Sequence, residues 1–456
     1  MEDVCSIAVS KVNDSVVWWG EAMTQIVSMV RTRSETFVQK RFSIFKKYWW
    51  LLGVLLVLVE GVGVWQYRGL YLVQFRQFEL VALGFSLLSF IVGTLFAAAK
   101  DKQRRIQLLA FSGFFSSLFA QLSVKELTFQ LQKMSVLGAS TLSAQAYGTH
   151  FIVGYTSFDD VKKLAADGTI AGIFLTRRNV EGKTIQQVRK EIDELQQIRS
   201  HSGFAPLIVT TDQEGGVVSK LSPPLEYQPP LNALLNSDSE MLNESEQEIV
   251  REYAQKQANG LKELGVTVNL SPVLDLQPDK LFKNDEFTKI RLRSLSTTPE
   301  KVSSIAAVYA VELKRNGITP TFKHFPGIGS VSVDTHISGA RLETPLSDLL
   351  KTDLIPFKQL GQDPDSLMML SHVVLTDVDP DHPVSFSKPV VQNLVKTQLH
   401  IKSKLITDDF SMGAVVNSND GVNGAVDKAL DAGVDYILFA YDPDLYYQAM
   451  EHLLRK

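Results

Sequence analysis

Eight short apolar runs, each followed by polar or charged residues, limit most strongly what this chain can fold into. They alternate with segments of helical periodicity, two of which (245–265 and 299–317) finish in glycine, the residue that best tolerates a left-handed C-cap. Short continuous apolar strands alternating with helices are typical of a parallel sheet covered on both faces. The apolar runs are 150–155, 171–176, 206–211, 266–271, 318–323, 367–372, 404–409 and 435–440.

Eight such strands are the number found in a (β/α)8 barrel, which is the predicted fold; a doubly wound open sheet is the alternative. A barrel requires the chemistry to follow the strands, because the carboxyl ends of parallel strands meet at one face. The sequence meets this requirement. The polar residues that end or follow the strands include Arg178, Asn179, Asp212, Glu214, Lys323, His324, His372 and Asp408.

The front of the chain has a different pattern, typical of membrane-spanning helices. Residues 80–99 carry no charge, and twenty residues are enough to cross about 30 Å of hydrocarbon; a buried helix of a soluble domain is the alternative. Residues 48–67 form a second predicted span, with tryptophans near both ends and one acidic residue, Glu60. Residues 106–123 are uncharged but contain several serines and glutamines. This segment could cross the membrane, lie in the membrane–water interface or pack on the neighbouring hairpin.

Composition agrees with a membrane-attached front and a soluble rear. Residues 1–105 contain 13 Lys and Arg against 8 Asp and Glu, although the whole chain has a net charge of −4. We therefore expect a basic segment over 1–45 with an amphipathic helix near 16–30, a transmembrane region over 46–123, and a catalytic barrel over 124–456. Near-neutral charge argues against a nucleic-acid partner. The single cysteine, Cys5, excludes a disulfide within the chain and a cysteine-based zinc cluster.

The segment KHFPGIGSVSVDTH (323–336) carries the strongest chemical signal. Lys323 and His324 end a strand, and the glycines and proline that follow break regular structure. In the pair Asp334 and His336, the carboxylate can hold one imidazole tautomer and make a proton-transfer group near neutral pH. A pair of ordinary surface-loop residues is the alternative interpretation.

Two further segments place carboxylates at the ends of strands. In KLITDDFSMGAV (404–415), Asp408 ends an apolar strand and is a candidate nucleophile or general base, while Asp409 begins the turn; a helix N-cap is the alternative role. In TTDQEGGVVSKL (211–222), Asp212 is placed to accept hydrogen bonds from substrate hydroxyls. Phosphate-binding glycine loops and metal-binding motifs are absent from the sequence, so we expect no cofactor and no metal.

Taken together, these motifs resemble glycoside hydrolase family 3, in its single-barrel β-N-acetylhexosaminidase branch, over roughly residues 123–456. DQEGG (212–216) resembles D-x-E-G-G, and KHFPGIGSVSVDTH resembles K-H-F-P-G-H-G-x-x-x-x-D-S-H. Residues 406–412 resemble the nucleophile motif S/T-D-D-L-S-M. Residues 269–276, 293–302 and 371–387 resemble the N-x-A/S-P-V-x-D motif, the R-S-F motif and the strand-6 loop of the family.

This resemblance implies a role for each matching residue. Asp408 would be the nucleophile that forms a covalent glycosyl-enzyme, and His336, oriented by Asp334, would be the general acid/base. Two inversions at one carbon then give net retention. The residues that would hold the hydroxyls of a terminal N-acetylglucosamine are Asp212, Arg293, Lys323 and His324.

The sequence also departs from the family pattern at three positions that could change substrate fit. Val217 and Lys220 stand where the family has arginines, and Ile328 replaces the second histidine of G-H-G. The alternatives to a β-N-acetylglucosaminidase are another family 3 glycosidase or phosphorylase, and a non-catalytic barrel that binds cell-wall glycan.

The basic residues indicate the topology. Six Lys and Arg between residues 31 and 47 place the N-terminus in the cytoplasm by the positive-inside rule, and four more at residues 100–105 lie on the same side after two spans. If 106–123 spans, the barrel lies outside the cytoplasm, beside wall glycan; if it does not, the barrel acts on recycled fragments inside. We expect a multi-pass protein of the cell membrane with an external catalytic domain.

Overall fold

The computed structural model describes residues 81, 84–91, 102–235, 241–278, 288–331 and 339–456. Two compact units divide the chain, one over Met1–Lys125 and the other over Glu126–Lys456. The predicted helix near 16–30 and the predicted span 48–67 lie outside the described residues. Of the predicted span 80–99, only residue 81 and residues 84–91 are described, and they are helical.

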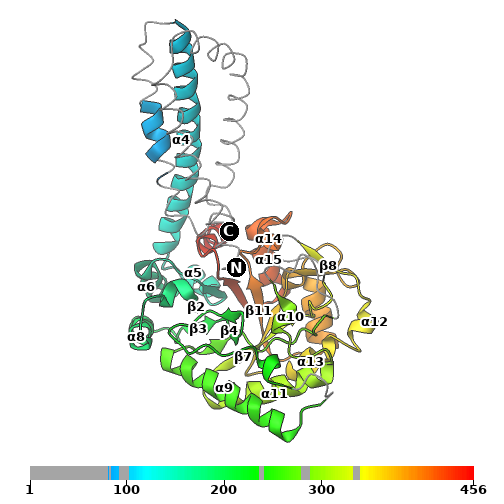
Figure 1. Ribbon diagram of the computed structural model, residues 1–456. Helices are drawn as coiled ribbons and strands as arrows, with labels where there is room; N and C mark the ends of the chain where they lie inside the picture. The colour runs from blue at the N-terminus through cyan, green and yellow to red at the C-terminus, as the bar shows by residue number, and fades with distance from the viewer. Residues whose placement is uncertain (1–80, 82–83, 92–101, 236–240, 279–287, 332–338) are drawn as a thin grey trace, which may run out of the picture. The chain divides into compact units, whose positions relative to one another are not determined.

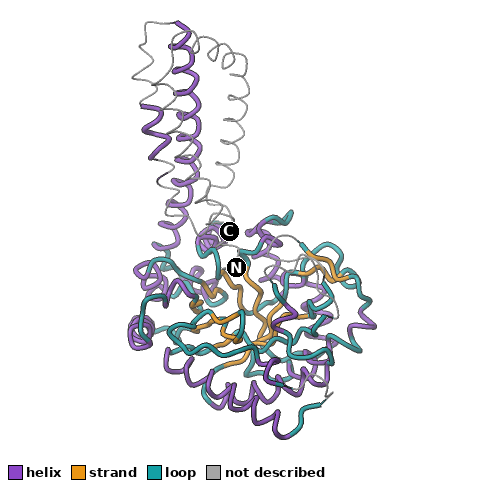
Figure 2. Tube along the Cα trace, in the orientation of Figure 1, coloured by secondary structure: helices purple, strands orange, loops and turns teal. Residues whose placement is uncertain are grey.

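The second unit is a closed barrel of eight parallel strands (Figures 1 and 2). Its strand order is β1-β12-β11-β9-β7-β6-β3-β2, and β1 pairs with both β12 and β2. The predicted barrel is thus confirmed, and closure rules out the open sheet. The barrel strands are β1 (Phe151–Val153), β2 (Gly172–Leu175), β3 (Ile208–Thr211), β6 (Val268–Asn269), β7 (Thr319–Phe325), β9 (Leu367–Leu370), β11 (Lys404–Asp409) and β12 (Tyr436–Phe439).

Helices surround the strands, as Figure 2 shows. Helix α5 (Leu142–Gly148) precedes β1, and the helices up to β7 are α6 (Phe158–Asp167), α7 (Arg177–Val180), α8 (Ile185–His201), η2 (Leu231–Leu234), α9 (Glu244–Leu264), α10 (Ile290–Arg293) and α11 (Pro299–Arg315). The later ones are α12 (Leu346–Leu349), α13 (Leu354–Leu360), η3 (Val384–Phe386), η4 (Pro389–Gln398), α14 (Gly413–Val416), α15 (Gly421–Ala432) and α16 (Asp444–Leu454). Two small sheets complete the unit: β4 (Gln213–Gly215) with β5 (Val218–Ser219), and β8 (Ala340–Leu342) with β10 (Val373–Leu375).

The helix boundaries follow from local chemistry. Helix α9 begins with a reciprocal capping box, in which the side chains of Asn243 and Glu246 each accept a hydrogen bond from the other's backbone N–H. It ends at Gly265, whose φ of 90° lies in the left-handed region that favours glycine. The predicted glycine ends are thereby confirmed, since Gly317 after α11 also has a positive φ, of 81°.

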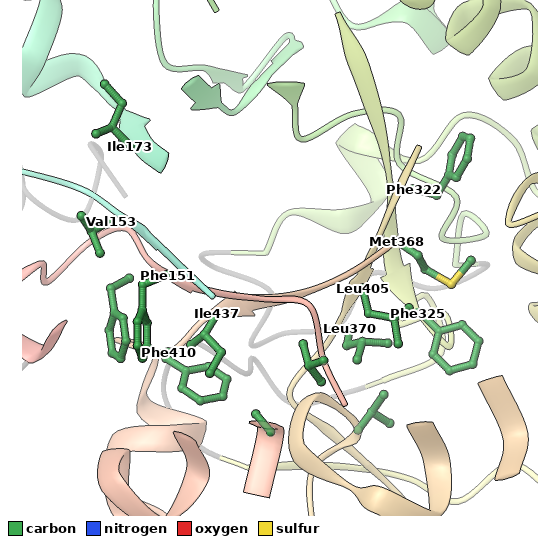
Figure 3. Packing of buried hydrophobic residues seen from close by; sticks show 14 of the residues in the cluster. Phe151, Val153, Ile173, Phe322, Phe325, Met368, Leu370, Leu405, Phe410 and Ile437 are labelled. Carbon is green, nitrogen blue, oxygen red and sulfur yellow. The ribbon is translucent and has the colours of Figure 1, made fainter. Parts of the chain in front are cut away.

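Apolar side chains fill both faces of the sheet, which explains why the strands read as continuous apolar runs. One cluster contains only strand or strand-end residues and fills the barrel interior, with Ile152, Phe174 and Ile406 among them. The alternating residues, such as Phe151 and Val153, point outward and join the larger cluster that includes the helices (Figure 3). The Phe151 ring packs edge-on against Tyr446 of α16 at 5.4 Å between centroids.

Helix α4 (Lys102–Leu137) is a single helix of 36 residues that contains the open segment 106–123. Among the described residues, one helical segment, Leu108–Leu137, is long and apolar enough to cross a membrane by length and composition. Within the second unit, the end of α4 packs on the barrel. Phe129 lies edge-on to Tyr447, and Lys133 forms a 2.5 Å ion pair with Asp160.

Candidate active site

The predicted site residues that the structure describes lie at the carboxyl-terminal ends of barrel strands or in the segments that follow these strands. Asp212 directly follows β3, Lys323 and His324 lie near the end of β7, and Asp408 lies near the end of β11. The strand pairing is irregular at two of these places, between Phe322 and Phe325 and between Ile406 and Asp409. Such irregularities turn side chains away from the regular alternation, and they are common next to active sites.

A buried network of ion pairs joins β7, the segment after β3 and the short helix α10. The ammonium of Lys323 lies 2.5 Å from Asp212 and 2.5 Å from Glu214. The guanidinium of Arg293 donates two hydrogen bonds to Glu214, of 2.9 and 2.6 Å, in the bidentate geometry that arginine and carboxylate favour. Lys323, Glu214 and Arg293 are almost fully buried, whereas the Asp212 side chain is 24% exposed. Asp212 is therefore the member of the network that a ligand can reach.

Charge pairing keeps this network ionised despite burial. Burial alone raises the pKa of Glu214, but the positive charges of Arg293 and Lys323 outweigh it and hold that pKa at about 2. Burial alone lowers the pKa of Lys323, but Asp212 and Glu214 outweigh this effect and raise it above its ordinary value. Glu214 is thus held as a carboxylate between the two cations Lys323 and Arg293.

His324 is held in one orientation by a fully buried carboxylate. Its Nδ1 lies 2.6 Å from Asp275 Oδ2, and its backbone N–H also donates to Asp275. Because the carboxylate accepts from Nδ1–H, Nε2 is left as the acceptor in the neutral ring, and it lies 3.3 Å from the Arg293 guanidinium. Asp275 also accepts a 2.8 Å hydrogen bond from the backbone N–H of Ile328, which fixes the start of the loop after β7.

The two neighbouring aspartates of β11 have different surroundings. Asp409 is buried and accepts hydrogen bonds from the backbone N–H groups of Ser411, Ala440 and Tyr441 and from the Ser411 hydroxyl. It therefore ties the end of β11 to the end of β12. Asp408 is half-buried, and one of its oxygens accepts a 2.8 Å hydrogen bond from the backbone N–H of Asp409. Of the two carboxylates, Asp408 is the one that a substrate could approach.

Two predicted catalytic residues, Asp334 and His336, lie outside the described residues. The structure thus brings together Asp212, Lys323, His324 and Arg293, through direct contacts or through Glu214. It places Asp408 near the end of a strand of the same barrel. Across the described ranges, no group of three or more His, Cys, Asp or Glu side chains is arranged to hold a metal ion.

Comparison with known proteins identifies the barrel. A family model, the glycosyl hydrolase family 3 N-terminal domain, matches residues 124–456. The chain belongs to glycoside hydrolase family 3. The predicted family is confirmed by this match.

Relatives and solved structures point to one branch of family 3. A β-hexosaminidase of Xylella fastidiosa is 32% identical over 288 residues, which cover 62% of this chain and 80% of that protein. A β-N-acetylglucosaminidase from Paenibacillus has 28% identity and a TM-score of 0.61, covering 69% of this chain and 58% of that one. NagZ from Neisseria gonorrhoeae, in complex with N-trifluoroacetyl-D-glucosamine, has 25% identity and a TM-score of 0.57, covering 67% and 84%. The prediction of a glycoside hydrolase in the β-N-acetylhexosaminidase branch is confirmed.

Three site residues of this family 3 barrel were not among the predicted ones. Glu214 bridges Lys323 and Arg293, Asp275 orients His324, and Asp409 joins two strand ends. Each stood in a quoted motif, namely DQEGG, NLSPVLDL and ITDDFSM. The signal that could have found them is an acidic residue at or shortly after the end of a predicted strand.

Positions that depart from the family pattern lie in contrasting surroundings. Val217, at the β4–β5 turn, is 48% exposed, so an apolar surface stands where the family has an arginine. The Ile328 side chain is buried and belongs to the main apolar cluster. Only its backbone takes part in the site, through Asp275.

Proposed function

We propose that this protein is a membrane-anchored, retaining β-N-acetylglucosaminidase that removes terminal N-acetylglucosamine from peptidoglycan-type glycans or muropeptides. The observation that carries the proposal is that one family 3 barrel holds both a half-buried Asp408 near the end of β11 and the Asp212–Lys323–Glu214–Arg293 network. The β-hexosaminidases and β-N-acetylglucosaminidases to which the chain is similar support the sugar class.

In this proposal Asp408 attacks C1 of the sugar and forms a glycosyl ester, while His336 donates a proton to the leaving oxygen. The same histidine, now a base, takes a proton from water as the water attacks C1 and releases Asp408. Two inversions leave the product with the starting configuration. Asp212 accepts a hydrogen bond from a sugar hydroxyl, and the buried ammonium of Lys323 behind it holds that carboxylate in place.

The test is hydrolysis of an aryl β-N-acetylglucosaminide compared with the matching aryl β-glucoside, with the anomer of the first product followed by NMR. We expect a strong preference for the N-acetylated substrate and a β product. Equal rates on both substrates would favour another family 3 glycosidase. A product that becomes a sugar phosphate when phosphate is added would favour a phosphorylase, and no turnover of either substrate would favour a binding barrel.

Replacement of His336 by alanine should lower kcat/KM by roughly 10²–10⁴-fold, the range contributed by a positioned acid/base. Substrates with good leaving groups should lose less in the first step, because they need less protonation. Asp334→Asn should be milder than Asp334→Ala, since an amide can still orient the ring. A His336→Ala variant within a few-fold of the wild type would remove this pair from the mechanism.

The topology is a second prediction. A reporter that is active only after export, fused after residue 140, should be active. The N-terminus is expected in the cytoplasm, and if residues 106–123 cross the membrane they form the third span, which places residue 140 outside. The length and apolar composition of the helical segment Leu108–Leu137 support a span there. A matched fusion at residue 101 should be inactive. If the fusion after residue 140 is also inactive, the barrel faces the cytoplasm and the enzyme would act on recycled fragments.

A further inference from the structure

The final turns of α4 have an apolar face that points away from the barrel. In the part of α4 that belongs to the second unit, the buried side chains are Phe129 and Val136, seven residues apart. Both join the main apolar cluster of the barrel. The opposite side of the helix carries Leu127, Leu131 and Met134, which are 60%, 58% and 68% exposed. A helix that covers a globular domain normally turns polar residues to that outer side.

The spacing of this stripe, defined as Leu127, Leu131 and Met134, is that of a coiled-coil seam. The steps of four and three residues are the a and d positions of a heptad, which put a narrow row of apolar side chains along one line of the helix. Polar residues such as Gln130 and Ser135 flank the row, and both are exposed. A helix that lies in lipid presents a broad apolar surface instead. The narrow stripe therefore fits a second helix better than a membrane surface.

The residues beside the stripe favour an identical helix in parallel. In a parallel pair, the flanking e and g positions of the two copies meet, and like charges there would repel. The flanking residues Thr128, Gln130 and Ser135 are uncharged. The charged residues Glu126 and Lys133 occupy the c positions of the heptad, away from the seam, and Lys133 is paired with Asp160.

The same heptad frame continues toward the start of the helix. Counting back from Leu127, the a and d positions are Val124, Ala120, Ser117, Gly113 and Ala110, and all of them are exposed. Small residues in such a row allow two helices to approach closely within a membrane. This step rests on the proposed membrane anchoring, which also makes two copies inserted in one membrane parallel.

We propose that the protein forms a parallel homodimer through the α4 stripe, with a second copy of the chain as the occupant of this face. The two barrels of the dimer are then held at the same height above the membrane. The interface uses no residue of the proposed active site.

Cysteine cross-linking of the full-length protein in membranes tests the proposal. In a Cys5→Ser background, Leu131→Cys should give a disulfide-linked dimer on mild oxidation, and Leu127→Cys and Met134→Cys should do the same. The matched control is Gln132→Cys, one residue further along α4 but away from the stripe, which should give little dimer. Leu127→Glu combined with Leu131→Glu should convert the detergent-solubilised protein to a monomer by native mass spectrometry, whereas Gln132→Glu should not.

Equal cross-linking at Leu131→Cys and Gln132→Cys, or none at any stripe position, would overturn the homodimer. A cross-linked species whose mass differs from twice that of the chain would overturn it as well, because another protein would then cover the face. Cross-linking and mass need no turnover, so they report on the dimer even if the aryl β-N-acetylglucosaminide is not hydrolysed. Where it is hydrolysed, unchanged rates in the stripe variants show that the barrel has kept its fold.

Discussion

Replacing Asp408 with alanine should lower kcat/KM for an aryl β-N-acetylglucosaminide by roughly 10³-fold or more, since loss of a nucleophile removes the covalent route. The fold should be preserved. Asp408 is half-buried, and one oxygen of its side chain accepts a local hydrogen bond from the backbone N–H of Asp409. Circular dichroism and the thermal unfolding midpoint should therefore stay close to those of the wild type.

Asp409→Ala is the matched control for that result. Its carboxylate accepts two hydrogen bonds from Ser411 and two from the backbone after β12, and its removal leaves buried N–H groups without an acceptor. We expect a clear loss of stability together with the loss of activity. A mechanism-based fluorosugar should label the wild-type protein at Asp408, as read by peptide mass spectrometry. Labelling at Asp409 would show that the two roles are exchanged.

The alternation of apolar runs with helical segments predicted the barrel, because burial alone decides which residues are apolar. Seven of the eight barrel strands lie within their predicted apolar runs, and β7 extends two residues past its run, to Phe325, because strands covered on both faces are apolar along most of their length. The glycine ends of α9 and α11 were predictable for a similar reason, because a single residue decides them. Such features need no knowledge of which segments meet in space.

The ion-pair network could be predicted only in part, because it depends on long-range pairing. Glu214 and Arg293 lie 79 residues apart, and Lys323 is still further along the chain. Its position after a strand marks Glu214, but nothing local shows that its side chain is buried between two cations. The same holds for Asp275, which meets His324 across 49 residues. These partners become visible only once the strands are placed around the barrel.

Glu214→Gln should be among the most destabilising single changes in the barrel. The amide has nearly the same shape but no charge, so that Asp212, which is 24% exposed and contacts Lys323, would be the remaining carboxylate of this network. Breaking a buried ion pair by removing one partner costs about 3–5 kcal/mol, because it leaves an uncompensated buried charge. The urea midpoint, followed by circular dichroism and residual activity, should fall accordingly.

Glu226→Gln is the matched control for Glu214→Gln, because it removes a carboxylate that pairs with Lys256 at the surface. Both side chains of that pair are mostly exposed, and exposed pairs contribute about 0–1 kcal/mol. We expect Glu226→Gln to shift the urea midpoint little. Equal shifts for the two variants would mean that the buried network does not hold the loops after β3 and β7 together.

The pH dependence of the same comparison gives an independent check, and its sign follows from the shifted pKa. Glu214 has its pKa lowered from 4.5 to about 2 in the folded protein, so folding favours the charged carboxylate. The stabilisation is therefore complete above about pH 4.5 and is lost progressively as the pH falls toward 2. The gap in unfolding free energy between wild type and Glu214→Gln should be constant from pH 7 to 5 and should narrow below pH 4.5. A gap that instead narrowed as the pH rose from 5 to 7 would assign the effect to a histidine.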